Sequence, residues 1–225
     1  MNEPARRYVL IASLVLAAGG WVVRAAAAMP ETAGRVAQLA GRAMAASPAG
    51  RVRPLAKGSV VRSGETVVTY PFSYVRLKLT DRSAVLLRPN TRFQIESYRM
   101  SKRPAKRRGF FSLLRGGFRY VTGLIGHTVR RNYRVRVATA TIGIRGTDYA
   151  VRLCDGDCAE YGADTRDGVY VRLEHNDGVE ICSGGPECVV LDQAGQETYI
   201  DFRGTPEQTG PYAVFADLSA PSCRQ

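Results

Sequence analysis

From residue 58 onward, apolar and polar residues alternate in one short segment after another. The alternation is clearest at residues 75–79 and recurs at 92–96, 133–137 and 169–173. Successive side chains of a β-strand point to opposite faces, so each segment predicts a strand with one buried and one solvent-facing side. Gly, Asp, Asn and Pro separate the segments, with few convincing helices between them. The sequence therefore predicts an all-β fold of antiparallel sheets, packed around one core as a sandwich or roll.

The first 28 residues have the pattern of an export signal. Arg6 and Arg7 precede an apolar run at 8–23, and the alanines at 25–28 offer the small side chains that a signal peptidase requires. The apolar run has 16 residues, fewer than the roughly 20 that span a bilayer comfortably. We therefore expect an N-terminal signal helix that is cleaved after Ala28, and a periplasmic protein. An uncleaved membrane anchor is the alternative.

The segments that flank the alternating region differ from it in composition. Residues 29–54 are rich in Ala and Gly and show no strand alternation, which predicts a linker with at most a weak helix at 33–46. The β domain is then expected at 55–202. Residues 203–225 contain three prolines and are expected to form a C-terminal tail without a second domain.

Four of the five cysteines fall in two close pairs, Cys154/Cys158 and Cys182/Cys188. In an oxidising compartment such pairs predict disulfides. A zinc site is the competing interpretation, but the spacings are wider than in a zinc ribbon, and we expect no metal. Pairing within each close pair is the simplest connectivity, and cross-pairing stays open. Cys223 is left over, as a free thiol or an intermolecular partner.

The formal net charge of +12 favours anionic partners. A dense run of cations at 99–108 is expected to form a solvated loop, because like charges repel. It consists of Arg99, Lys102, Arg103, Lys106, Arg107 and Arg108. The loop is either a docking patch for an anionic surface or an exposed insertion without a specific partner. For an exported protein, the expected partners are an envelope protein or an anionic envelope component, and not nucleic acid.

Catalytic motifs are missing from the sequence. The two histidines, His127 and His175, lie in no nucleophile elbow, metalloprotease helix or phosphate loop. Asp155, Asp157 and Glu160 cluster beside one cysteine pair, where a solvated disulfide loop is expected rather than a cation site. The sequence therefore predicts a protein that is not an enzyme, with no catalytic residues and no cofactor.

The most distinctive segment is an alanine-rich strand that ends in a turn and an aromatic residue. The turn contains Gly143, Arg145, Gly146, Thr147 and Asp148. Together with opening glycines at 58 and 64, a strand and turn at 77–83 and a glycine-rich segment at 113–126, this motif resembles the sequence signature of the FecR family over roughly residues 55–200. A structural role is expected for the motif. Arg145 has five donors, which could tie together loop carbonyls or a carboxylate such as Asp148.

The resemblance implies a periplasmic all-β domain that senses or transmits a signal by protein contact. In iron-uptake regulators, such domains receive a signal from an outer-membrane transporter and pass it to a sigma factor. Those regulators carry a cytoplasmic anti-sigma segment before a membrane helix, whereas seven residues precede the apolar run here. We therefore expect a stand-alone exported member that serves as a sensing, signalling or protein-interaction module. The alternative is a structural envelope protein that binds anionic peptidoglycan or lipopolysaccharide through its basic surface.

Overall fold

The computed structural model describes residues 30–163, 165–175, 177–184, 188–207 and 210–215. The expected signal peptide and Cys223 lie outside these residues. Within them the chain forms seventeen strands and one short α-helix, so the predicted all-β fold is confirmed.

The strands form two layers that share one long strand, β9 (Arg108–Val121). In spatial order the first layer contains β4 (Val60–Arg62), β1 (Thr32–Ala40), β6 (Tyr74–Leu79), β7 (Ala84–Leu87), the second half of β9, β12 (Asp148–Cys154), β13 (Gly168–His175), β16 (Glu197–Ile200) and β17 (Pro206–Glu207). The second layer contains β3 (Val52–Pro54), β2 (Ala43–Ala46), β5 (Thr66–Thr69), β8 (Arg92–Arg99), the first half of β9, β10 (Tyr133–Val137), β11 (Ala140–Ile144), β14 (Val179–Cys182) and β15 (Cys188–Leu191).

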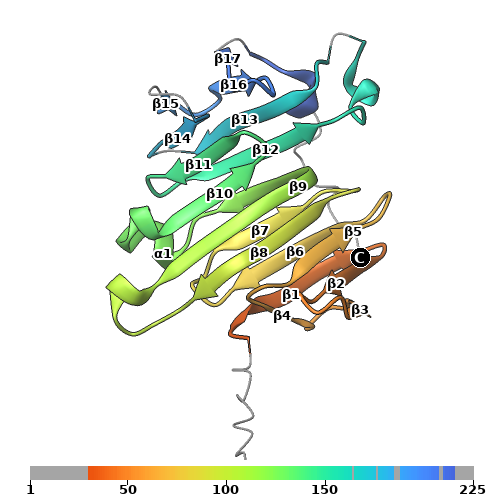
Figure 1. Cartoon of the computed structure of the whole chain (residues 1–225), viewed down its shortest axis with the longest axis vertical. Helices are drawn as coiled ribbons and strands as arrows, with labels where there is room; N and C mark the ends of the chain where they lie inside the picture. The colour runs from red at the N-terminus through yellow and green to blue at the C-terminus, as the bar shows by residue number, and fades with distance from the viewer. Residues whose placement is uncertain (1–29, 164, 176, 185–187, 208–209, 216–225) are drawn as a thin grey trace, which may run out of the picture.

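The chain crosses between the layers after every one or two strands. From β5 onward, each crossing places the next strands one step further along the long axis of the molecule, so the colours in Figure 1 run from red at one end to blue at the other. Strands such as β6 and β10 bury alternate side chains against the opposite layer. This stacking builds one continuous core from strands far apart in the sequence.

Strand β9 passes from one layer to the other at a glycine. Residues 109–113 pair with β8 and β10, and residues 116–121 pair with β7 and β12. Gly116 has φ +81° at the crossing, and a Cβ there would lie 2.5 Å from Thr91 Oγ1. Only glycine combines this backbone angle with so close an approach, so Gly116 lets a single strand serve both layers.

Aromatic side chains fill the core where β9 crosses. Phe93 contacts Phe111 and Phe118 with ring centroids 5.5 and 5.2 Å apart, and Tyr149 contacts Phe118 and Tyr120 at 5.8 and 5.9 Å. All five rings are almost completely buried. Stacked and edge-on packing at these distances is favourable beyond the burial of area, so this cluster fixes the spacing of the layers.

One strand pair departs from the predicted antiparallel arrangement. Strands β9 and β10 run parallel, because α1 (Leu124–Thr128) and the 3₁₀ turn η2 (Arg130–Asn132) carry the chain back to the start of β9. All other pairs among the described strands are antiparallel. No helix in the described part of the chain has the length and hydropathy to cross a membrane.

The linker prediction for residues 29–54 is wrong. Strands β1, β2 and β3 occupy most of this segment, and the expected weak helix at 33–46 is absent from it. Alanines such as Ala33 and Ala43 supply its buried positions, and an irregularity between Val36 and Gln38 interrupts the period of two. Gly34 is needed because the backbone of the neighbouring strand β6 approaches closely: a Cβ on Gly34 would lie 2.4 Å from the carbonyl oxygen of Lys78. The domain therefore begins at Thr32 rather than at 55.

The predicted C-terminal boundary is also wrong. Strand β17 pairs with β16, and the 3₁₀ turn η4 (Ala213–Phe215) packs Val214 and Phe215 on the outside of the first layer. These two side chains are 1% and 2% exposed, in a small cluster with Tyr170 and Tyr199. The fold therefore extends at least to residue 215. Two further 3₁₀ turns, η1 (Pro104–Lys106) and η3 (Ala159–Tyr161), lie in loops.

Candidate functional site

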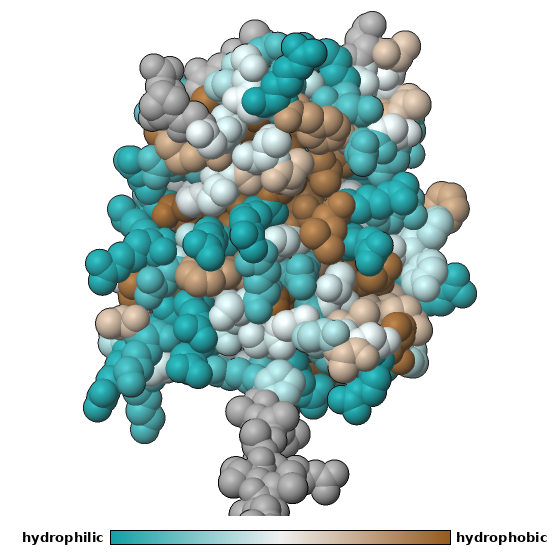
Figure 2. Space-filling model, viewed as in Figure 1, coloured by the Kyte–Doolittle hydropathy of each residue, from teal (hydrophilic) through white to brown (hydrophobic). Residues whose placement is uncertain are grey.

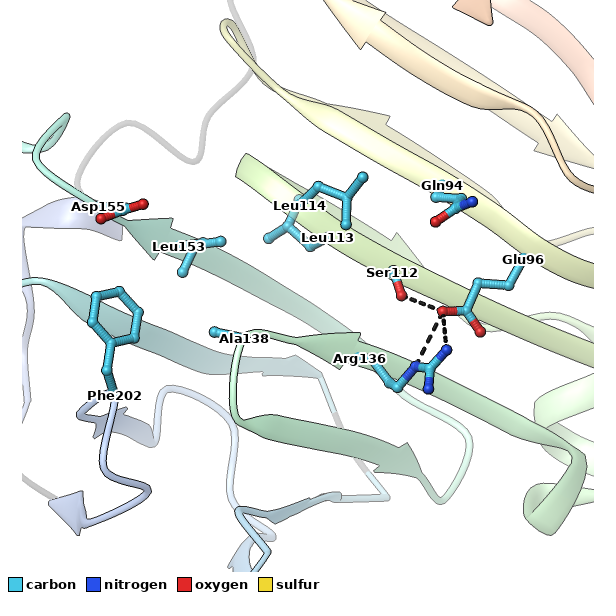
Figure 3. Close-up of a pocket in the computed structure, with 10 residues that line it drawn as sticks. All are labelled: Gln94, Glu96, Ser112, Leu113, Leu114, Arg136, Ala138, Leu153, Asp155 and Phe202. Atoms are coloured by element: carbon cyan, nitrogen blue, oxygen red, sulfur yellow. Dashed lines mark hydrogen bonds and ion pairs between the residues drawn. The ribbon is translucent and has the colours of Figure 1, made fainter. Parts of the chain in front are cut away.

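The outer face of the second layer carries an open groove of about 590 Å³. Strands β8, β9 and β10 form its floor, and the turn at 201–204 closes one end (Figure 3). In this view Phe202 and Asp155 lie at one end, and Glu96 and Arg136 at the other. The groove is therefore a shallow surface feature on the sheet, with an apolar part and a charged part.

The charged part is a network of three side chains from three adjacent strands. The Ser112 hydroxyl donates to Glu96 Oε1, and Arg136 donates to the same oxygen from Nε at 3.1 Å and from a terminal nitrogen at 2.6 Å. Burial by itself would raise the pKa of Glu96, but the hydrogen bond from Ser112 and the charge of Arg136 outweigh it and lower the pKa. Glu96 is thus a carboxylate at neutral pH with a fixed cationic partner.

The apolar part of the groove leaves large side chains accessible. Leu114 on β9 is 50% exposed and Phe202 is 41% exposed, and Leu113, Ala138 and Leu153 line the space between them. Figure 2 shows hydrophobic residues gathered in the middle of this face, with hydrophilic residues around them. An apolar area rimmed by polar groups is typical of an interaction site.

The turn that carries Phe202 is held by hydrogen bonds. Asp201 Oδ1 accepts from the backbone N–H groups of Arg203 and Thr205 at 2.9 and 2.7 Å. The Ser183 hydroxyl donates to the carbonyl oxygen of Gly204 at 2.6 Å. These contacts fix the position of the ring before anything binds, which reduces the entropic cost of binding.

The groove offers an apolar surface and a fixed ion pair to a ligand. Its serine donates to a carboxylate that is already paired with arginine, and no histidine is among the described residues that line it. The groove can bury an apolar side chain of a ligand and present a polar edge that aligns it.

The FecR-like motif lies elsewhere, at the turn between β11 and β12. The expected contact between Arg145 and Asp148 is wrong: Asp148 instead accepts two hydrogen bonds from Arg119, at 2.9 and 2.7 Å. Arg145 is exposed, and its side chain has no polar partner among the described residues. The sequence offered no signal for Arg119, because it lies 29 residues before its partner.

Two residues of the motif hold its turn in place. The buried Thr147 hydroxyl donates to the carbonyl oxygen of His175 at 2.5 Å, and the Thr147 carbonyl accepts from the Thr122 hydroxyl at 2.6 Å. Gly146 has φ +98°, whereas Gly143 lies within β11 and has no positive φ. Thr147 and Asp148 thus make the contacts that lock the loop against neighbouring strands, and Gly146 supplies the backbone angle of the turn.

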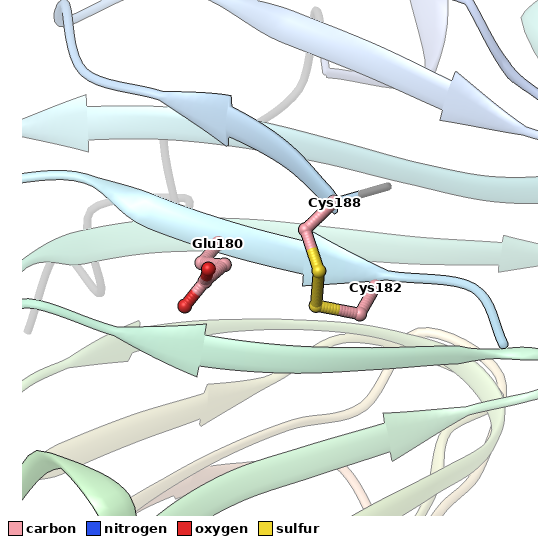
Figure 4. Close-up of side chains that lie close together, drawn as sticks. All are labelled: Glu180, Cys182 and Cys188. Carbon is pink, nitrogen blue, oxygen red and sulfur yellow. A yellow bond between two sulfur atoms is a disulfide. The ribbon is translucent and has the colours of Figure 1, made fainter. Parts of the chain in front are cut away.

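Both cysteine pairs form disulfides within the pair, as predicted. Cys154 and Cys158 are joined, and so are Cys182 and Cys188, which excludes the cross-pairing. Glu180 lies beside the second disulfide (Figure 4), and the ligand atoms of these three side chains lie within 4.8 Å of one another. Because the sulfurs are bonded to each other, they are not thiolates available to a metal.

The cationic run occupies the hairpin between β8 and β9. Arg99 pairs with Arg108 across the base of the hairpin, and Lys102, Arg103 and Lys106 are exposed around η1. Arg107 is partly buried and donates from Nε to the carbonyl oxygen of Ser101 at 2.8 Å. The segment is thus a surface loop in the structure.

Residues 65–160 match the family model described as FecR protein. Among solved structures, two crystal structures of a "putative anti-sigma factor" from Parabacteroides distasonis are similar, each with 12% identity and a TM-score of 0.47. The alignment covers 66% of this chain, which spans about 60% of that protein. No curated protein matches the sequence. The match includes the motif at 143–148, from which the resemblance was first drawn, and the similarity to the FecR family is therefore confirmed for residues 65–160.

Proposed function

We propose that this protein is a non-enzymatic sensing or signalling module of the periplasm that acts by binding another protein. The FecR domain carries the proposal, because the FecR family consists of regulatory proteins. The domain itself offers a preformed binding groove on the second layer. The function of the module is then to recognise a partner through surface shape and charge.

The periplasmic location is supported by the cysteine chemistry. Two disulfides join all four cysteines of the described residues. Disulfides persist in oxidising compartments such as the periplasm and are rare in the cytosol. The export-type pattern of residues 1–28 points to the same compartment.

The groove favours a partner segment with an apolar side chain. Leu114 and Phe202 would lose their exposed area to that side chain, and burial of apolar area drives association. The Glu96–Arg136 pair would set the orientation, because an ion pair at the rim contributes more to specificity than to affinity. The partner would lie across the outer face of the sheet, contacting it through side chains.

The proposal can be tested by cross-linking in the periplasm with the full-length protein. We expect Phe202→Asp to remove the cross-linked partner, because it places a charge in the apolar part of the groove. Phe72→Asp is the matched control: Phe72 is 91% exposed in the turn between β5 and β6, and its φ of +56° is one that Asp tolerates. Circular dichroism would confirm that both variants fold. A partner that Phe202→Asp and Leu114→Asp both retain would contradict the groove as its site.

A further inference from the structure

The described chain begins beside the cationic hairpin. Glu31, just before β1, accepts hydrogen bonds from Arg99 Nε and from the backbone N–H of Met100, both at 3.1 Å. The Glu31 carbonyl accepts from the N–H of Ser63 at 2.8 Å. Three contacts from two elements therefore fix where the N-terminal segment joins the fold.

Two other loops are bonded to the same end of the molecule. The Tyr98 hydroxyl, near the end of β8, accepts from the backbone N–H of Asp81 at 2.9 Å, and the Asp81 carbonyl accepts from the N–H of Leu124 in α1 at 2.8 Å. Asn132 in η2 donates to the carbonyl oxygens of Ala105 and Arg107 at 3.2 and 2.8 Å. The turn at 80–83 and the η2 turn thus lie against the hairpin.

This assembly concentrates positive charge, and we call it the basic end. It consists of the six cations of the hairpin together with Arg82, Arg130 and Arg131, and the last three are all exposed. Of these nine cations, only Arg99 has an acidic partner among the described residues. Of the carboxylates bonded into this end, Glu31 pairs with Arg99, and Asp81 is completely buried. Eight cations of the basic end therefore have no ion-pair partner among the described residues.

The apolar run at 8–23 ends close to this surface in the sequence. Seven residue steps separate Val23 from Pro30, and at about 3.5 Å each they reach at most roughly 25 Å. A bilayer that receives the apolar run would therefore lie close to the basic end. Clusters of roughly four to eight Lys and Arg beside a membrane segment bind anionic lipid headgroups.

We propose that residues 8–23 remain as an uncleaved membrane anchor, the alternative to cleavage after Ala28, and that the basic end lies against the phosphate headgroups of an anionic lipid bilayer. In Figure 1, α1 and the hairpin between β8 and β9 lie along the left side of the molecule, and this is the side that would face the membrane. The basic end includes no residue that lines the groove, so a protein partner would bind independently of the lipid contact.

The lysines of the chain provide a direct test. There are four, Lys57, Lys78, Lys102 and Lys106, and only the last two belong to the basic end. Full-length protein would be reconstituted into vesicles of phosphatidylcholine, with or without one-third phosphatidylglycerol. Its lysines would then be acylated with a water-soluble reagent, and the rate of acylation of each lysine would be measured by mass spectrometry. We expect phosphatidylglycerol to slow the acylation of Lys102 and Lys106 by roughly threefold or more, an effect that added salt removes. Lys57 and Lys78 should react equally in both vesicles.

A pair of charge-matched variants completes the test. Arg103→Gln/Arg130→Gln/Arg131→Gln removes three cations of the basic end and should clearly reduce the difference between vesicles. Arg76→Gln/Arg92→Gln/Arg203→Gln removes three exposed cations elsewhere and should preserve it.

Three outcomes would overturn the proposal: equal acylation of Lys102 and Lys106 in both vesicles, equal slowing of all four lysines, or protection of these two lysines by peptidoglycan alone. Loss of the lipid effect would leave cross-linking at Phe202 unchanged, so this failure is distinct from failure of the proposed function.

Discussion

Replacing Gly146 by alanine should destabilise the fold, because the motif turn uses a backbone angle that alanine adopts poorly. Gly146 has φ +98°, and a Cβ there would lie 2.6 Å from His127 Nδ1. A backbone angle in the left-handed region of φ raises the free energy of a residue that has a Cβ by about 1–2 kcal/mol. Alanine also restricts the unfolded chain, which offsets about 0.4–1 kcal/mol.

The contact with His127 adds little to this cost, because the His127 side chain is exposed and can move. We therefore expect Gly146→Ala to lower the free energy of unfolding by about 1 kcal/mol. For a domain of this size, that corresponds to a fall in Tm of about 2–4 °C.

Gly143 supplies the control within the same motif. The nearest atom to a Cβ at Gly143 is the carbonyl oxygen of Glu180 at 3.9 Å, and φ there is not positive. Glycine inside a strand is less stable than alanine by about 0.5–1 kcal/mol, so Gly143→Ala should leave the Tm unchanged or raise it. In a His127→Ala background, the cost of Gly146→Ala should persist, because it arises from the backbone and not from the ring.

Thermal unfolding followed by circular dichroism in a non-reducing buffer would measure these differences. Tryptophan fluorescence is less suitable, because the single tryptophan is at position 21, outside the described strands. A Gly146→Ala variant as stable as wild type would refute the reasoning, as would a Gly143→Ala variant that loses as much stability.

Two further predictions concern the groove and the first disulfide. The pKa of Glu96 is lowered from its ordinary value of 4.5, so its stabilising effect is present above that value and is lost as the pH falls through the folded pKa. Glu96→Gln should lower the free energy of unfolding by less than about 1 kcal/mol at neutral pH and should not change it at strongly acidic pH. Urea titrations at both pH values would check this. An equal loss of stability at both pH values would contradict the prediction. Replacing Cys154 and Cys158 by alanine opens a short loop and should cost about 2 kcal/mol. A urea midpoint that is unchanged in this variant would show that the disulfide does not contribute to stability.

Strands could be predicted from the sequence wherever apolar and polar residues alternate without interruption. The prediction failed where the buried positions of a strand are occupied by small side chains. Residues 75–79 alternate between large apolar and charged side chains, and they form β6 as expected. Ala33, Ala43 and Ala45 are equally buried, but alanine is common in linkers as well as in cores. A period of two is recognisable only when the buried side chains differ clearly in hydropathy from their neighbours.

The candidate site was less predictable than the fold, because its residues meet only through strand pairing. Glu96 and Arg136 are 40 residues apart, and each looks like an ordinary polar position in an alternating strand. Phe202 fell next to the expected domain boundary and had no strand pattern to interpret. Nothing local distinguished these residues from other surface positions.

The sequence by itself determined the all-β class and the FecR-like motif and favoured the pairing of nearby cysteines, because each depends on residues close together in the chain; only the structure excluded cross-pairing. The tertiary structure decided which charges meet. Asp148 pairs with Arg119 rather than with Arg145, and Glu31 lies against the cationic hairpin. These contacts depend on strand order and register, and alternation specifies only which face a side chain occupies, not which strand lies beside it.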